Sequence, residues 1–141
     1  MREDHPLYGM GADYVITDDF DVPMAAIERK TLEDLARSLA LQAPGESPRI
    51  FRQIKDLTCH PTPILLLEGQ PSLLYRRLEP AILGFQFWCA QQGVAVIYTS
   101  TPAAAARAVV QITRKMAKEA GIEPIEGDAS RGQPMTDPPT E

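Results

Sequence analysis

The chain has 141 residues, of which 44% are hydrophobic and 23% are charged, as expected for a globular protein with one modest core. No apolar run approaches the ~20 residues of a membrane-spanning helix, and Met1–His5 lacks the apolar segment of a signal peptide. Cys59 and Cys89 show no metal-ligand spacing or disulfide framework, so we expect an intracellular protein (cytoplasm or nucleoid, or nucleus in a eukaryote) without a membrane partner.

The net charge of −5 is unevenly distributed. Residues 1–120 carry 13 basic and 14 acidic side chains, whereas residues 121–141 carry 1 and 5. We expect one domain over residues 1–120 and a disordered acidic tail over 121–141, where four of the 13 prolines also lie. A nearly neutral body with local basic patches can bind DNA, but weakly and in a salt-sensitive way.

Two short strands are predicted near the start of the chain, at 14–17 and 24–30, joined by an acidic turn at Asp18–Pro23. We expect a hairpin that brings Asp13 and Glu28 to the same end of a sheet. The acids of the turn (Asp18, Asp19 and Asp21) are expected near that end as well.

The second strand ends in Glu28-Arg29-Lys30. Because side chains alternate along a strand, Glu28 and Lys30 share one face and Arg29 points to the other. Phosphodiester hydrolysis uses a carboxylate to hold a divalent metal and an ammonium group beside the attacking water or the developing charge. The alternative is an exposed strand with a salt-bridged face, since Glu-x-Lys is common by chance.

A helix is predicted from Thr31, with Thr31 as N-cap and Asp34 three residues on, followed by a loop at 42–48. A second helix is predicted over 49–58, and basic residues occupy its outer arc (Arg49, Arg52 and Lys55). This arc is either a solvated helix face or a surface that contacts DNA phosphates.

The rest of the chain alternates strands and helices. Buried strands are predicted at 64–69 and 94–98. A helix that is broken or kinked at Pro80 is predicted over 72–92. Its second piece, 81–92, is apolar on several sides, and Phe87 and Trp88 cannot face the same way, so one of them is a candidate for a dimer interface. Thr101-Pro102 predicts the start of a last helix, which ends at Gly121. The alternation indicates an α/β fold with helices on both faces of a sheet.

The chain resembles the XPF-type structure-specific nuclease family, including the archaeal Hef nucleases. The family signature is Gly-Asp, a gap, Glu-Arg-Lys, three residues and Asp, which corresponds here to Asp13, Glu28-Arg29-Lys30 and Asp34. Three later blocks follow in the family order, and the likeness covers about residues 8–118. These blocks are Arg49-Ile-Phe-Arg-Gln-Ile-Lys-Asp-Leu57, Pro63-Ile-Leu-Leu-Leu-Glu-Gly69 and Gly93-Val-Ala-Val-Ile-Tyr-Thr-Ser-Thr-Pro102.

The resemblance implies a restriction-endonuclease-like fold, a central mixed sheet flanked by helices, and metal-dependent cleavage of one strand in branched, flap or fork DNA. It implies that Asp13 and Glu28 hold Mg²⁺ or Mn²⁺ and that Lys30 orients the nucleophile or stabilises the transition state. Arg29 is expected to grip phosphate or else to be a member of a surface ion pair. Asp34 is expected to support the metal shell, to hold a basic residue, or only to cap its helix.

Glu68 is a candidate for a supporting group next to the site. Family members carry an earlier strand and helix with another acidic residue, and a DNA-binding domain that follows the nuclease domain. We expect this chain to lack both. A partner or a second copy would then add affinity for DNA. We therefore expect a homodimer or heterodimer through the helix at 81–92. The alternative functions are a non-catalytic DNA-binding or dimerisation scaffold and a Holliday-junction resolvase or general repair nuclease of the same fold.

Overall fold

The computed structural model describes residues 12–40 and 48–121 of the chain. The predicted loop at 42–48 and the predicted tail at 121–141 therefore lie almost entirely outside the described residues. No described helix is both long enough and apolar enough to span a bilayer.

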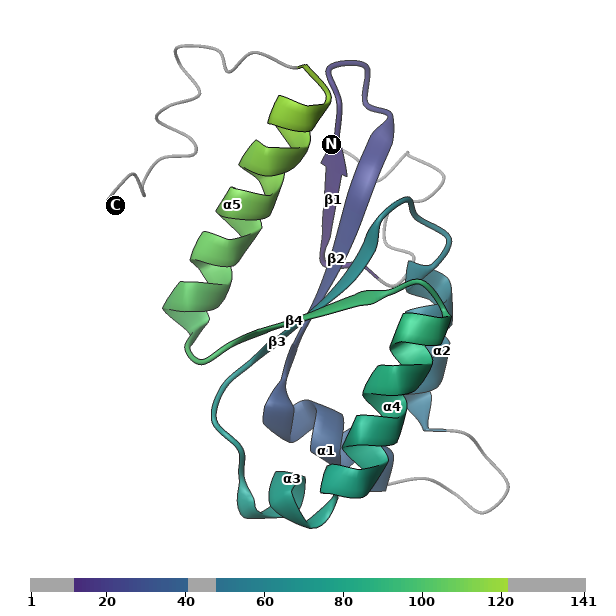
Figure 1. Cartoon of the computed structure of the whole chain (residues 1–141), viewed down its shortest axis with the longest axis vertical. Coiled ribbons are helices and arrows are strands. Elements are labelled where there is room, and N and C mark those ends of the chain that lie inside the picture. The colour runs from purple at the N-terminus through teal and green to yellow at the C-terminus, as the bar shows by residue number, and fades with distance from the viewer. Residues whose placement is uncertain (1–11, 41–47, 122–141) are drawn as a thin grey trace.

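One mixed sheet forms the centre of the domain, in the order β1-β2-β3-β4 (Figure 1). Its strands are β1 (Tyr14–Thr17), β2 (Pro23–Thr31), β3 (Pro63–Glu68) and β4 (Ala95–Thr99). β1 and β2 form the predicted antiparallel hairpin, while β2, β3 and β4 run parallel. Parallel neighbours need crossover connections, which the helices provide.

Helices cover both faces of this sheet, as predicted, with α5 on one side and the remaining helices on the other (Figure 1). The helices are α1 (Leu32–Ala40), α2 (Arg49–Leu57), α3 (Leu73–Arg77), α4 (Glu79–Gln91) and α5 (Pro102–Glu119). α5 contacts β2, β3 and β4, while α1, α2 and α4 each contact a strand and α3 contacts α1 and α4.

The alternation of side chains along β2 and β3 builds two apolar layers. Ala26 and Leu65 face α1, α2 and α4, whereas Ile27 and Leu66 face α5. These four side chains are fully buried, which confirms that β3 is covered on both faces. Successive side chains of β2 therefore lie in different layers. The same alternation applies to the Glu28-Arg29-Lys30 segment at the end of the strand.

Three helix starts follow the capping chemistry of their sequences. The backbone N–H of Asp34 donates to Thr31 Oγ1 at 3.0 Å, which confirms Thr31 as the cap of α1. Ser72 and Thr101 accept the equivalent bonds from Tyr75 and Ala104 at 3.1 and 3.0 Å. Thr31 thus begins α1 directly at the end of β2, which fixes the helix close to Glu28 and Lys30.

Two predicted elements differ from those observed. β4 is partly exposed and not buried, because it has a hydrogen-bonded neighbour on one side only and forms an edge of the sheet. The break in the helix at 72–92 falls at Leu78, and α4 begins at Glu79 with Pro80 in its first turn. Proline is tolerated there because the first N–H groups of a helix have no partner within the helix.

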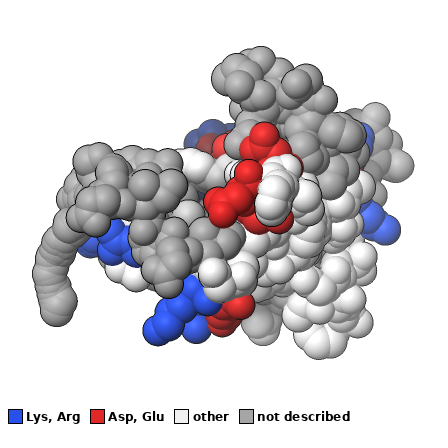
Figure 2. All heavy atoms as spheres, turned by 90° about the horizontal axis from the view of Figure 1, so that it is seen from above, with Lys and Arg blue, Asp and Glu red and all other residues white. Residues whose placement is uncertain are grey.

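The acidic turn was expected near Asp13 and Glu28, and this expectation was wrong. Asp18, Asp19 and Asp21 lie in the turn between β1 and β2, whereas Asp13 precedes β1 at its other end. Asp18 Oδ1 accepts the backbone N–H groups of Phe20 and Val22 at 2.8 and 2.9 Å. Figure 2, viewed from above Figure 1, shows acidic side chains gathered at this end of the molecule. The length of the strand separates these acids from the site.

Candidate active site

Asp13 lies beside Glu28 just before the hairpin ladder begins. The first ladder pair is Tyr14 with Ile27, and Asp13 is a bend residue immediately before β1. The backbone N–H of Asp13 donates to the carbonyl of Ile27 at 2.9 Å, one residue out of the register of the ladder, so Asp13 is not a regular strand partner of Glu28. The charge of Asp13 nevertheless acts on the ionisation of Glu28, so the two carboxylates predicted to hold a metal lie close together.

Glu28 lies in an electrostatic field set by its neighbours. The pKa of Glu28 is raised from 4.5 to about 7, first by burial and then by the charge of Asp13, while the charge of Lys30 opposes the rise. Both Asp13 and Lys30 are therefore close enough to Glu28 to act on its ionisation. Within the described ranges, no residue forms a hydrogen bond or ion pair with the ammonium group of Lys30. This group is available to a ligand.

Arg29 points to the opposite face of β2 and is bonded within the protein. Its Nε donates to Glu68 Oε1 at 2.5 Å, and its Nη1 and Nη2 donate to the Tyr14 hydroxyl and the Pro102 carbonyl, both at 3.2 Å. The bonds to Glu68 and then Tyr14 raise the pKa of Arg29 above its ordinary value. Of the two predicted roles of Arg29, this geometry favours the ion pair.

Asp34 lies on the first turn of α1, exposed beside the site. Its Oδ1 accepts a bond from Arg37 Nη1 at 3.3 Å, and Arg37 Nη2 also pairs with Glu33 at 3.2 Å. The cap of α1 is supplied by Thr31 and not by the carboxylate of Asp34. Of the expected roles, holding a basic residue is the one seen for Asp34.

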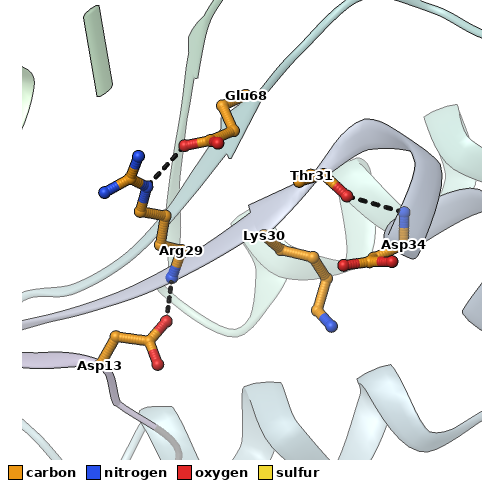
Figure 3. A pocket seen from close by; sticks show the side chains of 6 residues that line it. All are labelled: Asp13, Arg29, Lys30, Thr31, Asp34 and Glu68. Carbon is orange, nitrogen blue, oxygen red and sulfur yellow. Dashed lines mark hydrogen bonds and ion pairs between the residues drawn. The ribbon is translucent and has the colours of Figure 1, made fainter. Parts of the chain in front are cut away.

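Several of these side chains, though not that of Glu28, line an open pocket of about 290 Å³ (Figure 3). Figure 3 shows Arg29 turned toward Glu68, and Lys30 turned to the other side of β2, where Asp13 and Asp34 are drawn. Asp13 Oδ2 accepts the backbone N–H of Arg29 at 2.8 Å, which fixes this carboxylate at the edge of the pocket. The pocket is lined by Asp13, Arg29, Lys30, Thr31, Asp34 and Glu68.

The donor set fits a hard divalent cation that keeps most of its water. Asp13 and Glu28 offer two neighbouring carboxylates, and Mg²⁺ and Mn²⁺ bind through few carboxylates with water and phosphate oxygens completing the shell. No group of three or more His, Cys, Asp or Glu side chains suited to a metal occurs in the part of the chain that the structure describes. A closed structural metal site is therefore not present among these residues.

The basic arc of α2 lies outside this pocket. Arg49, Arg52 and Lys55 are exposed, and their helix packs on the same face of the sheet as Ala26, the face toward which Glu28 and Lys30 point. None of the three side chains forms an ion pair with another described residue. The arc is thus exposed on the side of the molecule toward which Glu28 and Lys30 point.

Tyr14 is a member of this environment that we did not predict. Its hydroxyl accepts the bond from Arg29 Nη1, so it belongs to the Arg29 face of the hairpin. The signal was present in the register, because Tyr14 pairs with Ile27 and therefore shares a face with Arg29. From the sequence alone, Tyr14 was only one of several strand-favouring residues.

The mixed sheet flanked by helices has the fold of an XPF-type nuclease domain. Residues 10–112, well over half of the chain, match the ERCC4 domain, and the chain belongs to this family.

Two solved structures are similar in fold and sequence. XPF from Aeropyrum pernix matches with a TM-score of 0.64 and 26% identity, over 81% of this chain and 50% of that one. XPF from the same organism in complex with DNA matches with a TM-score of 0.52 and 25% identity, over 69% of this chain and 45% of that one. The chain thus spans about half the length of these structures. Among curated proteins, none matches significantly.

Proposed function

We propose that this chain is a metal-dependent, structure-specific DNA endonuclease that hydrolyses a phosphodiester bond in branched, flap or fork DNA during repair or recombination. The observation that carries the proposal is the meeting of Asp13, Glu28 and Lys30 at the end of the β1–β2 hairpin, where the charges of Asp13 and Lys30 both act on Glu28. Membership of the ERCC4 domain family supports it. Such a substrate implies an intracellular protein.

Asp13 and Glu28 would hold Mg²⁺ or Mn²⁺ between their carboxylates. When bound, the metal would lower the pKa of a water molecule and offset charge on the phosphate. Lys30 would orient the nucleophile or stabilise the charge that develops on the phosphate oxygens, since its ammonium group has no bonded partner among the described residues. Asp34 would hold Arg37 at the rim of the pocket.

DNA binding is proposed for the basic arc of α2. Arg49, Arg52 and Lys55 would contact backbone phosphates, which give affinity and orientation but no sequence preference. The similar structure from Aeropyrum pernix contains DNA, which supports a DNA partner for this fold. Because the body of the chain is nearly neutral, this affinity would be modest and sensitive to salt.

A homodimer or heterodimer through α4 would add to this affinity. Phe85 and Trp88 pack against Phe51 of α2, with ring centroids 5.6 and 4.7 Å from it. Leu83 and Phe87 point outward, with 68% and 65% of their surface exposed. Two large apolar side chains one helical turn apart are suited to contact with a second chain.

A cleavage assay on a panel of DNA shapes tests the function. Purified protein with Mg²⁺ or Mn²⁺ should nick flap or fork DNA in preference to linear duplex. Glu28→Gln and Lys30→Ala should abolish nicking while the protein still folds and binds DNA. Preference for four-way junctions would indicate a resolvase instead. If the protein binds branched DNA but never cuts it with either metal, the scaffold alternative holds.

A further inference from the structure

The guanidinium group of Arg29 joins three separate parts of the fold. From β2 it reaches Glu68 at the end of β3, the Tyr14 hydroxyl on β1, and the Pro102 carbonyl at the start of α5. All three contacts lie on the α5 side of the sheet, whereas Glu28 and Lys30 project to the other side. Each guanidinium nitrogen already donates one bond within the protein.

The ion pair with Glu68 is mostly withdrawn from solvent. The side chain of Glu68 is 10% exposed and that of Arg29 is 26% exposed. A buried carboxylate without its partner would be an uncompensated charge, so the two groups hold one another in place. A phosphate that engaged Arg29 as a bidentate ligand would have to compete with these bonds.

The backbone of Arg29 connects this ion pair to the site. The N–H of Arg29 donates to Asp13 Oδ2 at 2.8 Å, so the same residue that binds Glu68 through its side chain orients Asp13 through its main chain. Glu28 and Lys30 are its direct neighbours. Fixing the backbone at Arg29 therefore fixes the directions of all three groups of the proposed site.

We propose that Arg29 and Glu68 are positioning residues, which hold Asp13, Glu28 and Lys30 in catalytic geometry from the opposite face of the sheet, and that Arg29 does not act by gripping DNA phosphate. Tyr14 assists by accepting the second bond. This inference rests on the proposed nuclease function and deepens it. It separates two roles that the Glu-Arg-Lys motif alone leaves open.

The test compares Arg29→Gln, Glu68→Ala, Glu68→Gln and Tyr14→Phe with the wild type. Three quantities are measured for each: kcat for flap cleavage, Kd for the same DNA without divalent metal, and the dependence of Kd on salt. The exposed pair Lys115 and Glu119 on α5, 3.2 Å apart, provides the matched control through Lys115→Gln and Glu119→Gln.

A positioning role predicts that kcat falls by about 10- to 100-fold in Arg29→Gln and Glu68→Ala while Kd and its salt slope stay within twofold of wild type. Glu68→Gln keeps an acceptor for Arg29 Nε and should recover part of the loss. The double variant Arg29→Gln/Glu68→Ala should be no worse than the poorer single variant, because the two residues act as one unit. Tyr14→Phe should give the mildest loss.

If Arg29 instead binds a DNA phosphate directly, the opposite results are expected. Arg29→Gln would then weaken DNA binding and reduce the salt slope by about 1, whereas Glu68→Ala would leave binding unchanged or tighten it. That pattern would overturn the proposal, as would Glu68→Ala with wild-type kcat. Amide hydrogen exchange provides a readout independent of cleavage, because Glu68→Ala should speed exchange at Arg29 and Lys30 without changing exchange in the later turns of α5.

If the wild type cuts no DNA, the proposed function fails separately. The salt slope of Arg29→Gln and the exchange rates of Glu68→Ala then decide the positioning role. Unchanged exchange at Arg29 in Glu68→Ala would rule it out.

Discussion

Asp13 lies close enough to Glu28, where the β1–β2 hairpin begins, that its charge adds to burial in raising the pKa of Glu28 to about 7. Two neighbouring carboxylates repel one another, and the charge of Lys30 offsets this repulsion only in part. A divalent cation bound by both carboxylates would reduce it. The proposed cation site rests on this pair, and so do the first predictions.

The first concerns stability and pH. The pKa of Glu28 is raised above 4.5 by folding, so its proton favours the folded state below about pH 4.5, and this contribution is lost as pH rises through about 7. Glu28→Gln cannot ionise and avoids the loss. We expect the variant to be more stable than wild type by about 1 kcal/mol near pH 8, a value reduced for partial exposure, and equal to it near pH 4. Urea unfolding at both pH values measures this. A variant that is less stable than wild type near pH 8 would contradict the prediction.

A second prediction concerns the pH dependence of cleavage. Glu28 must lose its proton to bind a cation, so at low Mg²⁺ the rate should rise with pH up to about 7 and then level off. High Mg²⁺ should move this rise to lower pH, since cation binding favours the ionised carboxylate. Rates measured across pH at two metal concentrations test the shift. An inflection that does not move with metal concentration would mean that another group controls the rate.

The basic arc of α2 is expected to control DNA affinity. Replacing Arg49, Arg52 and Lys55 together by Gln should lower the salt slope of binding by about 3 and weaken binding at least tenfold at moderate salt. The matched control replaces Arg107, Lys115 and Lys118, three exposed basic residues of α5, and removes the same charge from the other side of the sheet. Equal losses in both triple variants would show that only net charge matters and that α2 has no specific role.

Introducing a single charge on α4 tests whether the protein associates through this helix. Phe87→Glu places a carboxylate at the centre of the exposed apolar pair and should convert a dimer to a monomer in sedimentation at micromolar concentration. Gln91→Glu, one turn further on the same helix and exposed, is the control and should leave the dimer intact. Wild-type protein that is already monomeric at this concentration would dismiss the α4 interface.

Much of the fold could be predicted because local chemistry and packing agree. The caps at Thr31 and Thr101 begin their helices as expected, and the apolar run at 64–69 forms the doubly buried β3. β4 has a similar apolar sequence, but its exposure depends on being the edge of the sheet. The order of strands in a sheet depends on how the whole chain packs, so it cannot be predicted from the composition of one segment.

The candidate site was predictable in its parts and only partly in its arrangement. Strand parity separated Arg29 from Lys30, and Figure 3 shows these two side chains on opposite sides of β2. The proximity of Asp13 to Glu28 depends on the hairpin, whose turn carries Asp18, Asp19 and Asp21 to the opposite end. The bonds from Arg29 to Glu68, Tyr14 and Pro102 join distant segments, so no local pattern could reveal them.

Binding of Mn²⁺ to the wild-type protein with fork DNA, followed by electron paramagnetic resonance, tests the central claim most directly. Asp13→Asn and Glu28→Gln should each weaken Mn²⁺ binding at least tenfold, while Asp19→Asn in the distant turn should leave it unchanged. Mn²⁺ bound as tightly by Glu28→Gln as by wild type would contradict a metal site built from Asp13 and Glu28.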